Sequence, residues 1–268
     1  MLFSIDKQTC IKCGHCVAAC PAFIIAREDD DPPYSIPENE AGCIKCGHCA
    51  AICPSGALDL KFMPLADMPP SDYKPFSKEQ TEAFIRNRRS IRRYSDKKVD
   101  QQTLQELIQL SGYAPSAKNG QMIGWAVHSN PRLLAEMFID WLMDLQNSDP
   151  KTFTFVRGDT LLARWKRGVD PIARNAPHVV VVYSSPDWPM GAVDTVIAMS
   201  YMELIAPSLG LGACWAGYLM RTLNTYQPIR EAFGLSDQKI AHGALMLGYP
   251  EYGYHHWPLR KQPNIMWK

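Results

Sequence analysis

Apolar and polar residues follow a regular pattern in the part of the chain after residue 77. Ser77 can cap a helix that runs to about Arg88. Apolar residues at helical spacing predict a second helix over residues 101–112. The pattern predicts further helices at residues 131–145, 192–209 and 229–233, and strands at residues 125–129, 179–183 and 241–247. Because helices and strands alternate, we expect a sheet with helices on both faces.

The first 77 residues have a different pattern and contain an internal repeat. The segment at residues 10–21, Cys-Ile-Lys-Cys-Gly-His-Cys-Val-Ala-Ala-Cys-Pro, recurs at residues 43–54 with two substitutions. Residues 63–75 contain four prolines, which oppose helix formation and favour an extended connection. We therefore expect a small domain at residues 1–62, a proline-rich linker at residues 63–77 and a larger domain at residues 78–268.

Composition narrows the class of protein. A chain of 268 residues with a formal net charge of +1 gives no reason to expect nucleic acid or an anionic membrane surface as a partner. The N-terminus lacks a basic segment followed by an apolar stretch, and Asp194 and Glu203 interrupt the longest apolar region. We therefore expect a cytoplasmic protein without a membrane span. Eight of the nine cysteines lie within the first 53 residues, which in a reducing cytosol indicates metal binding rather than disulfides.

Each repeat carries three cysteines at two-residue spacing and a fourth, followed by proline, after three residues. This is the ligand run of bacterial ferredoxins, in which the fourth cysteine binds the other cluster. We therefore expect two [4Fe–4S] clusters, one on Cys10, Cys13, Cys16 and Cys53, and the other on Cys20, Cys43, Cys46 and Cys49. Two structural zinc sites are the alternative, but zinc modules usually use separated Cys-x2-Cys pairs. Residues 1–60 resemble the 2[4Fe–4S] ferredoxin family.

Glycine and histidine recur at equivalent positions in the two repeats. Gly14 and Gly47 suit a tight loop in which backbone N–H groups approach the sulfurs. His15 and His48 could tune a cluster, but thiolates alone complete both clusters, so we expect exposed loop residues. For the ninth cysteine, Cys214, a buried structural thiol is favoured over a redox-active one.

Four segments of the larger domain combine cations, amides and small residues. The first runs from Arg88 to Arg92, and its guanidinium groups could bind a phosphate. The others are the turn-rich loop at residues 114–121, the glycine-containing segment at residues 209–218, and residues 247–250 followed by Arg260. Taken alone, the arginine run is typical of a solvated helix end, and the second segment of an ordinary loop.

In this order and spacing the four segments resemble the nitroreductase family over residues 80–268. With the N-terminal module, the chain resembles the ferredoxin–nitroreductase fusions of anaerobes. The resemblance implies an α+β sandwich, with helices on both faces of a mainly antiparallel sheet. It also implies an intertwined homodimer that binds FMN at its interface.

The resemblance also implies roles for individual residues. The FMN phosphate and one edge of the isoalloxazine would be held by Arg88, Arg89, Ser90 and Arg92, and Arg260 would return to the phosphate. From the partner subunit, the ring would be lined by Pro115, Ser116, Ala117 and Asn119. Ala216 and Gly217 would place backbone N–H groups near the flavin N5. The chain departs from the family's Gln-Pro-Trp at residues 121–125, so Gln121 is given no role.

Together these features predict an oxidoreductase that needs no catalytic side chain beyond its cofactors. Electrons would come from a low-potential donor, either a ferredoxin-like protein or NAD(P)H, and pass through the clusters to FMN. The acceptor would be a small nitroaromatic, quinone-like or similar organic molecule. Two other hypotheses stay open: a dedicated metabolite reductase that performs dehalogenation or ene reduction, and a non-enzymatic electron carrier or redox sensor.

Overall fold

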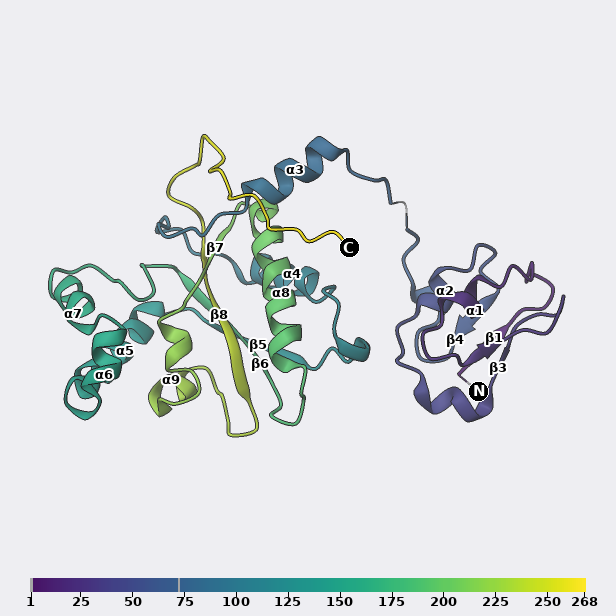
Figure 1. Cartoon of the computed structure of the whole chain (residues 1–268), viewed down its shortest axis with the longest axis horizontal. Coiled ribbons are helices and arrows are strands. Elements are labelled where there is room, and N and C mark those ends of the chain that lie inside the picture. Colours follow the sequence, from purple (N-terminus) through teal and green to yellow (C-terminus); the bar gives the residue numbers. More distant parts are fainter. Residues whose placement is uncertain (1, 72) are drawn as a thin grey trace. The chain divides into compact units, whose positions relative to one another are not determined.

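The computed structural model describes residues 2–71 and 73–268. Met1, in the expected small domain, and Asp72, in the expected linker at residues 63–77, lie outside the described residues. The chain divides into two compact units, one made of residues 1–75 with Lys118–Gly120, and the other of residues 76–117 and 121–268 (Figure 1). Each unit is described by itself.

The first unit is built around the two copies of the cysteine repeat. Strand β1 (Phe3–Ile5) pairs antiparallel with β4 (Leu58–Leu60), and the short strands β2 (Ile25–Ala26) and β3 (Tyr34–Ser35) pair with each other. Each repeat forms one short helix, α1 (His15–Ala19) or α2 (His48–Ala51). Two 3-10 helices, η1 (Pro37–Gly42) and η2 (Leu65–Asp67), follow β3 and β4. The apolar core of this unit includes Phe3, Ile24, Ile25, Ala50, Leu58 and Leu60.

Both helices of the repeat begin after a glycine in the left-handed region. The φ angles are 76° at Gly14 and 77° at Gly47, a conformation that residues with a Cβ rarely adopt. A Cβ at Gly47 would also lie 2.9 Å from the Sδ atom of Met63. Glycine is expected at these two loop positions, and the left-handed backbone there is the physical reason for it.

The second unit opens with helices whose ends the sequence predicts well. Helix α3 (Lys78–Asn87) starts at a capping box, in which Ser77 and Gln80 satisfy each other's backbone N–H groups. Helix α4 (Gln101–Ser111) is capped by Asp100, and the backbone N–H of Gly112 closes its last turn.

The centre of the second unit is a four-stranded sheet. Its strands are β5 (Ile123–His128), β6 (His178–Ser184), β7 (Gly212–Trp215) and β8 (Ile240–Gly248), in the order β5-β6-β8-β7, and all pairs are antiparallel. The predicted α+β class with an antiparallel sheet is confirmed. Strand β7 was not predicted, because the small residues in this segment are weak strand formers.

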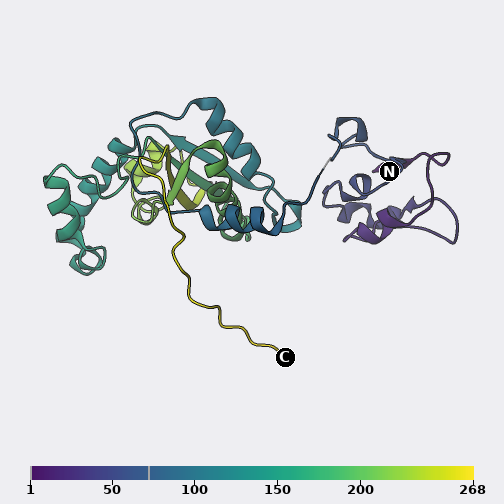
Figure 2. The same cartoon turned by 90° about the horizontal axis from the view of Figure 1, so that it is seen from above.

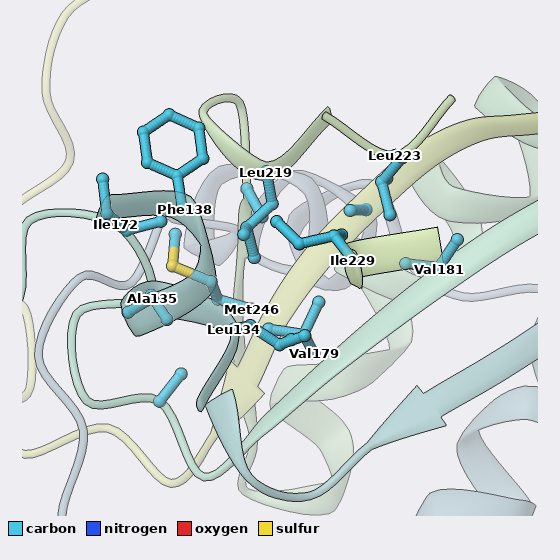
Figure 3. Close-up of a cluster of buried hydrophobic side chains, with 14 of the residues drawn as sticks. Leu134, Ala135, Phe138, Ile172, Val179, Val181, Leu219, Leu223, Ile229 and Met246 are labelled. Carbon is cyan, nitrogen blue, oxygen red and sulfur yellow. The ribbon is translucent and has the colours of Figure 1, made fainter. Parts of the chain in front are cut away.

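Helices cover both faces of this sheet, as predicted. Val180 and Val182 of β6 face α4 and α8 (Gly191–Ile205). Val179 and Val181 face the opposite layer, which contains α5 (Pro131–Ser148), the 3-10 helix η5 (Leu219–Arg221) and α9 (Gln227–Ala232). Figure 3 shows this second core, with Phe138 of α5 beside Leu219 of η5. Successive strand residues alternate between the faces, so a continuous valine run fills both cores.

Smaller helices complete the second unit. Helices α6 (Pro150–Phe155) and α7 (Gly158–Lys166) pack beside α5. The 3-10 helix η3 (Ala117–Asn119) precedes β5 in the sequence, and its last two residues belong to the first unit. The 3-10 helix η4 (Ala206–Leu209) continues α8. By length and composition alone, Gly191–Leu209 would be long and apolar enough to cross a membrane. In the fold, one face of α8 packs against α4 and the strands of the sheet, whereas Val193, Val196 and Tyr201 of the same helix are exposed.

The C-terminal segment, residues 251–268, contains no helix or strand and is exposed throughout. Figure 2 shows this segment extending from the second unit as a stretch of irregular backbone. Its first part contacts α3, where the indole of Trp257 donates a hydrogen bond of 2.9 Å to Asn87 and lies beneath the Arg86 guanidinium. The remainder exposes several large apolar side chains, namely Leu259, Ile265, Met266 and Trp267.

Candidate functional site

The eight cysteines of the repeat surround two separate cavities in the first unit. Each cavity has a volume of about 20 Å³. The first is lined by Cys10, Cys13, Cys16 and Cys53, and the second by Cys20, Cys43, Cys46 and Cys49. The fourth cysteine of each repeat therefore lies with the three cysteines of the other repeat, in the two sets that the sequence predicts.

The surroundings of the thiols differ between Cys16, Cys49 and Cys53. Burial raises the pKa of the Cys16 thiol, and it raises the pKa of Cys49 to about 11. At Cys53 burial also acts upward, but hydrogen bonds, including one of 3.3 Å from the Ala57 N–H, outweigh it and lower the pKa. Among the described residues, no three His, Cys, Asp or Glu side chains converge as they would around a single metal ion. In each set, the four thiols lie around a cavity and do not converge on the position of one ion.

The two histidines of the repeat are exposed, as predicted. His15 begins α1 and His48 begins α2, and both side chains face solvent.

The arginine segment at residues 88–92 runs beside strand β7 in the second unit. Ser90 forms a parallel bridge with Ala213, and the Ile91 N–H donates a 2.9 Å hydrogen bond to the Ala213 carbonyl. Gly212 permits this approach, because a Cβ there would lie 2.4 Å from the Ile91 side chain. Backbone contacts with β7 therefore fix the position of the segment that contains the predicted phosphate-binding residues.

The three arginines of this segment have different surroundings. Arg88 forms an ion pair of 3.3 Å with Glu203 of α8, whose other carboxylate oxygen accepts a 3.0 Å hydrogen bond from the Trp215 indole. Arg89 donates to the backbone carbonyl of Arg88, while its buried Nε has no hydrogen-bond partner among the described residues. Arg92 is exposed and lines a cavity.

This cavity, which we call the arginine cavity, lies where β7 ends and has a volume of about 350 Å³. Of the predicted flavin residues, Arg92 and Gly217 line it. Trp215 and two arginines that the sequence analysis did not single out, Arg174 and Arg221, also line it. No acidic residue belongs to this lining among the described residues.

The two predicted backbone donors differ in their availability. The Ala216 N–H donates a 2.9 Å hydrogen bond to the Ala244 carbonyl of β8. Gly217 faces open space, because a Cβ built there would meet no atom within 4 Å. Of the two, Gly217 is therefore the one that borders space for a bound group.

The loop at residues 115–119 is fixed to the start of α8. Asp194, 2% exposed, accepts a 2.9 Å hydrogen bond from the Ala117 N–H and one of 2.8 Å from the Trp188 indole. The Ser116 hydroxyl accepts from the Gln121 N–H at 3.0 Å. The predicted ring-lining residues Pro115, Ser116, Ala117 and Asn119 are not among those that line the arginine cavity of this single chain.

Two further residues of interest lie at opposite extremes of exposure. Arg260 lies in the exposed C-terminal segment and does not line the arginine cavity. Cys214 is 5% exposed and borders that cavity. Burial raises the pKa of its thiol, against the opposing effect of Arg92 and Arg174, so the thiol stays protonated near neutral pH. This environment is that of a structural cysteine.

Three features of the second unit fit a flavin mononucleotide. The Arg92 guanidinium lines the cavity and can neutralise a phosphate. Gly217 leaves room for a flat ring, and the Arg89 Nε is a buried donor without a protein acceptor. The residues present therefore fit the cofactor that the sequence predicts.

A cysteine-rich unit and an α+β unit with a cation-lined cavity together define a redox protein that binds prosthetic groups. The model of the nitroreductase family matches residues 85–249, and that of a 4Fe-4S dicluster domain matches residues 9–58. The chain belongs to the nitroreductase family. It is an FMN-dependent oxidoreductase of the nitroreductase type that carries a 4Fe-4S ferredoxin domain.

Individual relatives agree with this assignment. The chain is 26% identical to a predicted NADH dehydrogenase/NAD(P)H nitroreductase of Archaeoglobus fulgidus, over 65% of this chain and 87% of the relative. The nitroreductase of Bacteroides fragilis, solved with FMN bound, superposes with a TM-score of 0.52 at 24% identity, over 70% of this chain and 95% of that one. An iodotyrosine deiodinase bound to FMN and 3-iodo-L-tyrosine superposes with a TM-score of 0.50 at 16% identity, over 70% and 98% of the two chains. At these identities the superpositions establish the fold.

Asp194 gives a first test of how the site is assembled. Asp194→Asn should lower the free energy of unfolding by about 1–3 kcal/mol, because the amide nitrogen cannot accept from Ala117 or Trp188 and leaves a buried donor unsatisfied. Chemical denaturation of the purified protein measures this. Asp140→Asn, on the exposed side of α5, is the matched control and should change stability by less than about 0.5 kcal/mol. Equal effects of the two substitutions would show that Asp194 does not hold the loop.

Proposed function

We propose that the chain passes electrons from a low-potential donor through two [4Fe–4S] clusters to FMN and on to a small organic acceptor. The observation that carries this proposal is the grouping of the eight thiols into two separate sets of four, in the same chain as a nitroreductase fold with an arginine-lined cavity. A nitroaromatic or quinone-like molecule is the expected class of acceptor.

Under this proposal each cluster is held by cysteines from both repeats. Cys10, Cys13 and Cys16 hold one cluster together with Cys53, and the other three cysteines of the second repeat hold the other with Cys20. Such clusters supply one-electron transfer at a potential tuned by hydrogen bonds to the sulfurs and by exposure. The N–H···S bond from Ala57 to Cys53 is one such contact.

Under the same proposal FMN binds at the arginine cavity. Arg89, Ser90 and Arg92 lie near its phosphate and one edge of the ring, with Arg88 held in place by Glu203. The cofactor, when bound, accepts electrons singly and delivers them in pairs. The protein's part is to place the cofactor, to neutralise its charge and to leave an open face for the acceptor. Gly217 leaves room for the ring.

We propose that the protein is a cytoplasmic homodimer. The chain is rich in cysteine outside any disulfide, as expected in a reducing compartment. The exposed C-terminal segment presents large apolar side chains, which in a single chain would remain in contact with water. A partner subunit that covers this segment would bring Arg260 and the loop at residues 115–119 to a shared flavin site.

The electron donor can be identified directly. Purified holoenzyme is mixed anaerobically with NADH, NADPH or reduced ferredoxin, and bleaching of the flavin absorbance is followed. We expect reduced ferredoxin to bleach the flavin fastest, because a cluster domain provides entry for one-electron carriers. Rapid bleaching by NADPH or NADH alone would instead assign the donor role to the nucleotide and leave the clusters outside the electron path.

The same purified holoenzyme can distinguish the proposed function from two other functions. A dedicated metabolite reductase would turn over one member of a substrate panel far faster than the others. A carrier or redox sensor would turn over no acceptor in the steady state. We favour catalysis, because the arginine cavity offers far more space than a relay between two electron carriers would use.

The predicted phosphate contacts can be tested one at a time. Arg92→Ala and Arg260→Ala should each weaken FMN binding by about 1.5–3 kcal/mol, which is roughly 10- to 150-fold in the dissociation constant, because a charge-assisted contact is lost. Fluorescence titration of apoprotein with FMN measures the change. Arg164→Ala, on the exposed side of α7, is the control and should bind FMN like the wild type. Wild-type affinity in both test variants would show that the phosphate lies elsewhere.

A further inference from the structure

Three guanidinium groups from distant parts of the sequence meet at the arginine cavity. Arg92 follows the segment beside β7, Arg174 precedes β6, and Arg221 ends the 3-10 helix η5. In the described part of the chain, none of the three forms an ion pair with an acidic side chain, and Arg221 instead lies over the ring of Phe155 at 5.0 Å. The cavity therefore has a concentrated positive charge that the protein does not neutralise.

Arg174 is held at the cavity by a specially built turn. Asp170, 5% exposed, accepts hydrogen bonds of 2.9–3.0 Å from the backbone N–H groups of Ile172, Ala173 and Asn175. Arg174 itself has a φ of 56°, in the left-handed region that arginine rarely adopts. An unfavourable backbone conformation kept by three hydrogen bonds to one buried carboxylate indicates that the position of this side chain matters.

The remaining walls of the cavity are apolar or aromatic. Ile172 and Met246 are buried, and Trp215 and Tyr218 present rings. A ligand that matches all of these walls has a flat, largely apolar body and a negatively charged group. A carboxylate pairs with guanidinium groups in a bidentate manner and is stabilised most where water is partly excluded.

We propose that Arg174 and Arg221 form an anion subsite for the electron acceptor, and that the physiological acceptor is an aromatic compound that carries a carboxylate or similar anionic group. This inference rests on the proposed function, because it assumes that an acceptor binds beside the flavin in the arginine cavity. The segment at residues 88–92 then binds the cofactor phosphate, whereas Arg174 and Arg221 determine which acceptor binds.

The test compares acceptors that differ only in charge. Wild-type holoenzyme, Arg174→Asn, Arg221→Gln and the control Arg164→Gln are assayed with 4-nitrobenzoate and with nitrobenzene, reduced flavin being supplied by dithionite. Asparagine is chosen at position 174 because it tolerates the left-handed backbone. FMN per chain is measured for each variant, and calorimetry measures binding of 4-nitrobenzoate to the oxidised holoenzyme.

We expect the wild type to prefer 4-nitrobenzoate, through a lower KM. Each cavity variant should lose about 10- to 100-fold of the ratio of kcat/KM values for the two acceptors, with FMN content and nitrobenzene turnover unchanged. Calorimetric affinity for 4-nitrobenzoate should fall by the same factor, and Arg164→Gln should match the wild type.

Two results would overturn the inference. Loss of FMN from Arg174→Asn or Arg221→Gln would show that these arginines bind the cofactor phosphate. Equal losses for both acceptors, or a wild type with no preference between them, would show that the charge does not select the acceptor. If the wild type reduces neither acceptor, the proposed function fails, whereas the calorimetric comparison still decides whether the anion subsite exists.

Discussion

Cys20→Ala is expected to remove about four irons and about four sulfides from a protein that contains about eight of each. The cluster lost should be the one bound by the second repeat, although Cys20 belongs to the first repeat. The reason is spatial, because Cys20 lines the cavity of Cys43, Cys46 and Cys49. Anaerobic purification followed by iron and sulfide analysis measures the loss.

Double substitutions make this prediction sharper. Cys20→Ala combined with Cys46→Ala should lose no more iron than either change alone, because both residues serve one cluster. Cys20→Ala combined with Cys13→Ala should lose nearly all of the iron. Cys214→Ala is the control, since this buried cysteine lies outside both cysteine-lined cavities, and it should retain about eight irons. The opposite pattern in the doubles would place Cys20 with its own repeat, and stoichiometric zinc without sulfide would reject the clusters altogether.

Gly217→Val is expected to weaken FMN binding. A valine side chain would occupy the open space beside Gly217 and overlap the volume assigned to the ring. Overpacking of about 1–3 kcal/mol corresponds to FMN binding that is roughly 5- to 150-fold weaker. The φ angle of Gly217 lies outside the left-handed region, so the change adds no backbone strain there. Flavin titration and FMN content after gel filtration measure the effect.

Two further variants separate the local effect from a general one. Gly217→Ala adds a single methyl group and should weaken binding less than valine does. Ala163→Val, at an exposed position of α7, is the control, because this residue does not line the arginine cavity. If Gly217→Val binds FMN as tightly as the control, the ring does not lie against Gly217.

Local signals in the sequence were sufficient for most of the fold. The helix that starts at Ser77 and the valine run of β6 have strong patterns that depend on neighbouring residues only, and both are present as expected. Strand β7 was missed because Gly212 and Ala213 carry almost no side-chain pattern. Gly212 is small for a tertiary reason, since the Ile91 side chain packs against it. No local pattern encodes that contact.

The site was predictable to a lesser degree, for a similar reason. The spacing of eight cysteines specified which thiols would share a cavity, because the repeat itself fixes that geometry. Arg174 and Arg221 were missed because neither the turn that holds Arg174 nor the 3-10 helix η5 that ends at Arg221 contains a motif. The arginine–asparagine pair at residues 174–175, both in the left-handed region, would have been a weak signal of a special turn. Asp194 and Glu203 were noted only as charges that interrupt an apolar segment.

Those two acidic residues give α8 a role beyond covering the sheet. One end of the helix binds the Ala117 N–H through Asp194, and the other end binds Arg88 and the Trp215 indole through Glu203. The nine residue steps from Asp194 to Glu203 span about 13.5 Å of rigid helix. The two loops should therefore not open independently. In hydrogen–deuterium exchange, the protons of the Ala117 amide and the Trp215 indole should therefore exchange at the same rate, which is set by the opening of α8 as a unit. A loop amide ordinarily exchanges far earlier.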